Sequence, residues 1–168
     1  MHPEITKRFI ALEARRKAFV ERVKALPQDK QTAKPNAKSF SPAEVVMHLA
    51  IAEQGNLGFL QKAPPPTLKG KKTHMTFIFK KTVASMQKPV KPIMTPSSMI
   101  PKGPVNVDEA ARVWEDVRRE TAKYLEQVAT PDEPFIKFLF FFGLGSAADY
   151  LTLLEAHMTY HEQRFPQV

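Results

Sequence analysis

The sequence predicts an all-α fold, an up-down four-helix bundle with one long crossover that carries a basic, proline-rich excursion. Four long segments repeat their apolar residues at the spacing of an α-helix, and no segment sustains the alternation of a half-buried strand. Helices with one apolar stripe bury it by packing together. The excursion, residues 62–106, separates the second predicted helix from the third and supplies the crossover.

The first two helices have clear boundaries in the sequence. The first is expected over residues 3–26, where apolar residues recur at intervals of three, four and seven. A polar loop is expected over residues 27–40. The second helix begins with a capping box, in which Ser41 and Glu44 bond each other's backbone, and it has the favoured proline at its first helical position.

The second half of the chain alternates proline-rich and helical stretches. Residues 74–88 predict a short amphipathic helix, and residues 89–106 hold five prolines and predict an extended loop. The third long helix opens at Val107 with acidic residues, which suit a helix N-terminus. The aromatic stretch 131–145 predicts a buried connection, and the last helix starts at Ser146.

Composition narrows the possible functions. A chain of 168 residues with 43% hydrophobic and 25% charged residues predicts one domain, residues 1–168. It has no cysteine, which excludes disulfides, thiolate metal sites and cysteine nucleophiles. No apolar run is long enough to span a bilayer and no apolar signal core opens the chain, so we expect a cytoplasmic protein without a membrane partner.

The net charge of +8 comes from one segment. Residues 62–102 contain nine lysines and no acid, which leaves 16 of the 25 basic residues against all 17 acids elsewhere. The segment is either a solvated insertion or a surface for an anionic partner. Phe77 and Phe79 could stack bases, but no nucleic-acid reader motif is visible, which disfavours a nucleic acid.

Three of the five histidines could converge. His157 and His161 are four residues apart on a predicted helix and therefore share a face, and His48 lies on an inward row of the second helix. Three neutral imidazoles are a ligand set for zinc, nickel or iron(II), and a catalytic ion keeps further positions for water or substrate. The alternative is that these are ordinary histidines at the edge of the core.

Two segments resemble a known family. Residues 41–53 (SPAEVVMHLAIAE) and 154–165 (LEAHMTYHEQRF) are similar to the second-helix and fourth-helix signatures of the DinB-like (DNA-damage-inducible) four-helix-bundle metalloproteins. The resemblance implies a divalent metal ion, most simply zinc or nickel, with iron also suited, held by His48, His157 and His161. It also implies a homodimer. Relatives include S-transferases that use low-molecular-weight thiols such as bacillithiol, and a mycothiol-dependent maleylpyruvate isomerase.

The function expected from these features is a metal-dependent transferase or hydrolase of a small-molecule substrate, similar to the thiol S-transferases. The ion would lower the pKa of a bound thiol or water, and lysines of the excursion could steer an anionic thiol toward it. The alternative from another class is a non-catalytic metal-binding or stress-response bundle.

Carboxylates near the histidines give one weak candidate for catalysis. Glu44 precedes His48 by one turn and could orient its imidazole or assist proton transfer. The simpler interpretation is that Glu44 only completes the capping box. Glu155 and Glu162 are expected to be solvated.

Overall fold

The computed structural model describes residues 1–37, 39–62, 75–88, 95–127, 136–137 and 144–165. Within these residues the all-α prediction is confirmed, because every element apart from one ladder of two-residue strands is helical. The elements are α1 (Pro3–Lys24), α2 (Gln28–Thr32), α3 (Pro42–Lys62), α4 (Met75–Gln87), the 3₁₀ turn η1 (Ser97–Met99), α5 (Val107–Glu126), β1 (Ile136–Lys137), β2 (Leu144–Gly145) and α6 (Ala147–Glu162).

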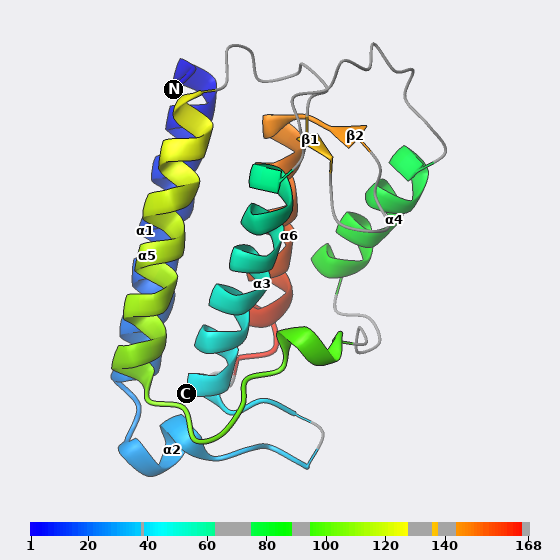
Figure 1. Ribbon diagram of the computed structural model, residues 1–168. Coiled ribbons are helices and arrows are strands. Elements are labelled where there is room, and N and C mark those ends of the chain that lie inside the picture. The colour runs from blue at the N-terminus through cyan, green and yellow to red at the C-terminus, as the bar shows by residue number, and fades with distance from the viewer. Residues whose placement is uncertain (38, 63–74, 89–94, 128–135, 138–143, 166–168) are drawn as a thin grey trace.

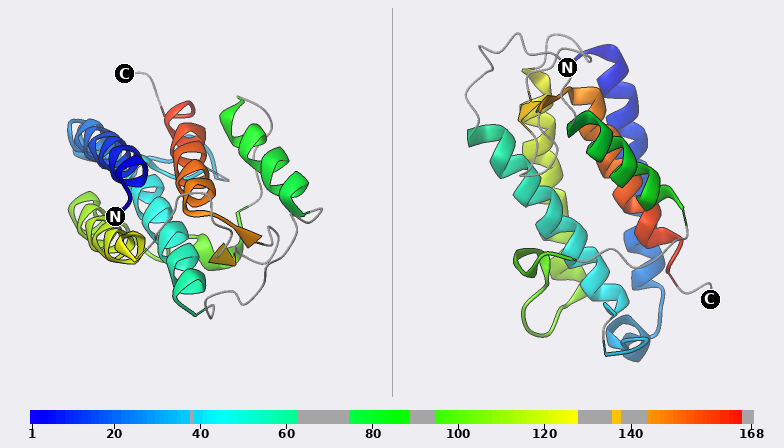
Figure 2. Two further views of the ribbon diagram at one scale, coloured as in Figure 1. Left: turned by 90° about the horizontal axis from the view of Figure 1, so that it is seen from above. Right: turned by 90° about the vertical axis from the view of Figure 1, so that its right-hand side faces the viewer.

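The four long helices lie side by side with similar axes, and the shorter α4 packs on the outside of α6 (Figure 1). α1 and α6 run in one direction, whereas α3 and α5 run in the other (Figure 2). Because α3 and α5 are parallel, the chain between them must return along the length of the molecule. This return contains α4 and η1.

The hydrophobic core lies between the four long helices. Each helix contributes large side chains that are almost fully buried, among them Phe19 of α1, Leu49 of α3, Trp114 of α5 and Leu154 of α6. The ring of Phe19 meets Trp114 edge-on, with centroids 6.5 Å apart. The stripes read from the sequence are therefore the faces that the helices bury.

The predicted start of α3 is confirmed in detail. The Ser41 backbone amide donates to Glu44 Oε2 at 2.9 Å, and the Glu44 amide donates to Ser41 Oγ at 3.2 Å. A second capping box joins Ser146 and Asp149 at the start of α6. Both helices that carry the candidate histidines therefore have N-termini fixed by reciprocal hydrogen bonds.

Two short elements depart from the sequence predictions. The expected loop 27–40 contains α2, a single turn that is supported locally because the Gln31 side chain donates to the carbonyls of Leu26 and Lys24 at its start. The expected connection 131–145 contains the antiparallel β1–β2 pair, and its remaining residues, 131–135 and 138–143, lie outside the described residues. Two residues per strand are too few to show an alternating pattern.

Glu155 and Glu162 were expected to be solvated; both are partly exposed, but each also binds an arginine that the sequence did not indicate. Both bind arginines of α1: the Arg8 guanidinium lies 2.9 Å from Glu155 Oε2, and Arg15 Nε donates to Glu162 Oε2 at 3.0 Å. The partners are seven residues apart on each helix, so the same contact repeats after two turns. These pairs fasten α1 along the outer side of α6.

A buried ion pair joins three of the long helices. The guanidinium of Arg118 in α5 makes two hydrogen bonds to the carboxylate of Glu53 in α3, one of them 2.7 Å long, and both side chains are only 1% exposed. Glu13 of α1 accepts a further bond from Arg118 at 3.3 Å. The network fixes the rotation of these helices about their axes, because only one register brings the charges together.

Part of the basic excursion is visible. Its predicted short helix is confirmed as α4, which buries Phe79 and Val83 and exposes Lys80 and Lys81. Residues 63–74 and 89–94, with most of the other prolines and lysines, lie outside the described residues. In the described part of the chain, no helix combines the length and apolar character that crossing a bilayer requires.

Candidate metal centre

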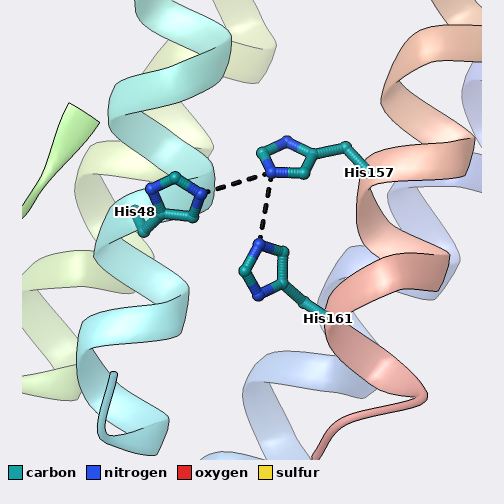
Figure 3. Close-up of side chains that lie close together, drawn as sticks. All are labelled: His48, His157 and His161. Carbon is teal, nitrogen blue, oxygen red and sulfur yellow. Dashed lines mark hydrogen bonds between the residues drawn. The ribbon is translucent and has the colours of Figure 1, made fainter. Parts of the chain in front are cut away.

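The three candidate histidines meet between α3 and α6. His48 projects from α3, and His157 and His161 project from α6 one turn apart, so that the three rings point toward a common centre (Figure 3). One ligand nitrogen from each lies within 4.8 Å of the others. His48 and His161 are buried, and His157 is half-buried.

The spacing of the nitrogens fits ligation of a single ion. His157 Nε2 lies 3.2 Å from His48 Nε2 and 3.2 Å from His161 Nε2. Two nitrogens that each lie about 2.0–2.1 Å from a tetrahedral ion are about 3.3 Å apart. An ion could therefore enter this cluster with little movement of the imidazoles.

A backbone carbonyl fixes the orientation of His48. The Nδ1 atom of His48 lies 2.8 Å from the carbonyl oxygen of Met99 in η1. A carbonyl can only accept a hydrogen bond, so Nδ1 carries the proton and donates it. The lone pair of the neutral ring is then on Nε2, the atom that faces the other two histidines.

In the neutral cluster, the three nitrogens that face one another cannot all make well-aligned hydrogen bonds. With a lone pair on His48 Nε2, its contact with His157 needs a proton on His157 Nε2. That proton would stop His157 Nε2 from accepting a hydrogen bond from His161. A single N–H on His157 Nε2 cannot point at both neighbours, so at most one of the two 3.2 Å contacts is a well-aligned hydrogen bond, whereas a cation between the three nitrogens would engage all three lone pairs.

Burial keeps the cluster uncharged. Desolvation lowers the pKa of His157 to about 3, and the positive charge that His48 would carry lowers it further in the same direction. Desolvation also lowers the pKa of His161 well below its usual value, and it lowers the pKa of His48 against the opposing effect of the Met99 carbonyl. All three imidazoles are consequently neutral near pH 7, the state in which histidine binds metal.

Aromatic side chains pack against the cluster on two sides. The half-buried ring of Phe40 lies 5.0 Å from the His48 ring, measured between centroids. The ring of Tyr160 meets the His161 ring at 5.0 Å with an angle of 82° between the planes. The guanidinium of Arg164 lies over the Tyr160 ring, 3.7 Å from its centroid.

Glu44 has its described contacts elsewhere. One carboxylate oxygen closes the capping box with Ser41, and the other lies 2.8 Å from Lys34 Nζ. The group that bonds His48 is instead the Met99 carbonyl. A catalytic role for Glu44 stays a prediction. Sequence reasoning missed the Met99 contact because a backbone carbonyl has no residue-type signal.

Comparison with known proteins places the cluster in a family context. The model of the family described as the DinB superfamily matches residues 11–163, a range that includes all three histidines. No curated protein and no solved structure matches the chain.

Proposed function

The chain belongs to the DinB superfamily, and we propose that it uses a divalent metal ion on His48, His157 and His161 to transfer or hydrolyse a small molecule. The observation that supports this most strongly is the geometry of the three Nε2 atoms. They face one point, and their two 3.2 Å contacts cannot both be well-aligned hydrogen bonds while the rings are neutral.

The donor set limits which ion fits. Among the described residues, the group of possible ligands contains three imidazoles and no carboxylate. Imidazole nitrogen suits zinc, nickel, copper and iron(II), whereas magnesium, calcium and manganese prefer oxygen ligands. Zinc or nickel is therefore the proposed ion, with iron(II) as the next choice.

The ion would supply a nucleophile near neutral pH, because it lowers the pKa of a thiol or water bound to it. The protein's own groups would prepare the site for this chemistry. The Met99 carbonyl holds His48 in the required tautomer, and burial keeps the ligand rings neutral. His157 is half-buried, so solvent reaches part of this residue.

The family resemblance adds three parts to the proposal. A low-molecular-weight thiol is the proposed nucleophile, a homodimer is the proposed assembly, and an up-down four-helix bundle with one crossover is the proposed topology. Two helices running each way, with α4 on the connection between α3 and α5, support this topology. The site would then lie between one helix of each direction, α3 and α6.

Metal content tests the proposal. Purified wild-type protein, His157→Ala/His161→Ala and His2→Ala would be loaded with zinc or nickel, desalted and analysed for metal. We expect close to one ion per chain in the wild type and in the His2→Ala control, because His2 caps α1 outside the cluster. The His157→Ala/His161→Ala variant should retain much less metal per chain. Absence of retained metal in the loaded wild type would contradict the proposal.

Activity is the second part of the test. The loaded wild type and double variant would be mixed with panels of thiols and electrophiles, with esters and amides as substrates for hydrolysis. Turnover that follows metal content would support a transferase or hydrolase. Stoichiometric metal without any metal-dependent turnover would instead favour a non-catalytic metal-binding protein.

A further inference from the structure

We propose that Arg164 determines the substrate class of this metal centre by binding a carboxylate on the small molecule that reaches the ion. This inference rests on the proposed function, because it requires an ion on the three histidines. To the proposed function it adds Arg164 as a residue that determines specificity, and a small molecule with a carboxylate as the class of substrate.

The backbone brings Arg164 back toward the ligand face of α6. Arg164 follows His161 by three residues and His157 by seven, which is the spacing of one helical face. α6 ends at Glu162, but the turn continues because the amide of Arg164 donates to the carbonyl of His161 at 3.2 Å. The arginine is thus held one turn beyond the second α6 histidine.

The side chain of Arg164 is held by Tyr160. Its Nη1 atom donates to the Tyr160 carbonyl at 3.0 Å, and its Cζ atom lies 3.7 Å from the centroid of the Tyr160 ring. The Tyr160 ring in turn packs edge-on against the His161 ring. A guanidinium that is already stacked loses less freedom when it binds a ligand, and it stands one aromatic ring from a proposed metal ligand.

The charge of the site favours an anion. Three neutral imidazoles leave the full double charge of a divalent ion uncompensated, and the described ligand group contains no carboxylate. Glu162, an acid of the same turn, lies against α1, where Arg15 binds both of its oxygens. The guanidinium of Arg164 adds a second positive charge, which is separated from the His161 ring by the ring of Tyr160. A negative substrate group is therefore attracted by both cations.

A carboxylate is an anionic group that a small thiol can carry and that arginine binds well. Arginine's planar fork of donors matches the two oxygens, and one edge can bind them while the face stays on an aromatic ring. Arg164 is exposed, so a ligand can reach it from solvent. A thiol with a carboxylate a few bonds away could then bind the ion and the guanidinium together.

A pair of matched thiols tests this inference. 3-Mercaptopropionate and 3-mercaptopropionamide have the same length, but only the first carries a charge. The protein would be loaded with Co²⁺, whose absorption shows both metal binding and thiolate coordination. We expect the wild type to bind the carboxylate at least tenfold more tightly than the amide. Arg164→Gln should remove most of this preference and leave the affinity for the amide unchanged, and Arg164→Lys should keep part of it.

The control variant is Arg119→Gln, which removes an exposed arginine from α5 and should keep the wild-type preference. The Co²⁺ spectrum of each variant shows whether the cluster is intact. Three results would overturn the role of Arg164 while metal binding stands. The wild type could bind the two thiols with equal affinity, Arg164→Gln could keep the wild-type preference for the carboxylate, or neither thiol could give a thiolate band. Failure of the wild type to bind Co²⁺ would overturn the metal centre itself, and this inference with it.

Discussion

His48 and Met99 are 51 residues apart, yet the imidazole Nδ1 lies 2.8 Å from the Met99 carbonyl oxygen. This contact connects the proposed metal ligand of α3 to η1, the turn near the end of the long connection between α3 and α5. Anything that fixes the His48 ring should therefore also hold η1.

The first prediction concerns this connection. Metal binding should slow amide hydrogen exchange in residues 95–106, because an ion on His48 Nε2 fixes the ring that donates to Met99. Mass spectrometry of metal-loaded and metal-free protein measures this. A peptide covering α2 should exchange equally in both forms, since the contacts described for the three imidazoles involve η1, Phe40 and Tyr160 rather than α2. Equal exchange in residues 95–106 with and without metal would show that η1 is independent of the site.

The second prediction is a thermal shift. An ion present at about one hundred times its dissociation constant should stabilise the folded state by roughly 2.7 kcal/mol. For a chain of this size that corresponds to a rise in Tm of about 5–10 °C. His161→Ala should lose most of the shift, whereas His2→Ala should keep it. A shift of the same size in His161→Ala would mean that the ion binds elsewhere.

The third prediction concerns stability against pH in metal-free protein. The folded state lowers the pKa of His157 to about 3 and lowers those of His48 and His161, so the unfolded chain binds more protons below about pH 6.5. The free energy of unfolding should therefore fall as the pH decreases from about 7 to 4, and above about pH 8 these groups should contribute little pH dependence.

Urea unfolding at pH 7.5 and pH 5.0 checks this. The midpoint for the wild type should be lower at pH 5.0, and His157→Gln should show a smaller decrease because glutamine does not titrate. The carboxylates are common to both proteins and cancel in the comparison. Equal decreases would show that His157 is charged at pH 5.0 in the folded protein.

The candidate site was more predictable than the contacts that support it. The spacing of His157 and His161 determines that they share a face, and the apolar neighbours of His48 on its helix indicate that it points inward. The bond from His48 to the Met99 carbonyl depends on where a long loop returns, which local patterns do not encode. The proposed metal ligands were thus accessible to sequence reasoning, whereas the group that orients one of them was not.

Contacts between polar residues of different helices were also missed. Glu155 and Glu162 occupy the polar side of α6, and sequence alone does not show that α1 covers that side with arginines at the same seven-residue interval. The pairing of Arg118 with Glu53 likewise depends on how α3 and α5 are rotated relative to each other. The periodicity of one helix gives its buried face, but it does not give the partner of a charge on that face.

The last prediction concerns that buried pair. Arg118→Met should destabilise the protein by about 3–5 kcal/mol, because it leaves the Glu53 carboxylate buried without its main partner. Arg118→Met combined with Glu53→Gln removes the uncompensated charge and should recover part of the loss. Denaturant unfolding of the two single variants and the double variant gives the coupling energy between the two residues.

The ion pair should also matter to the metal centre. Glu53 follows His48 on α3, and Arg118 Nη2 lies 3.7 Å from the sulfur of Met158, the neighbour of His157 on α6. The pair thus fixes α3 and contacts α6 close to the residues that present the imidazoles. If that placement matters, the double variant should bind metal more weakly than the wild type even at temperatures where both are fully folded. If the effects of the two substitutions on stability are additive, the pair does not couple α3 to α5. If the metal affinity of the double variant is unchanged, the pair does not align the histidines.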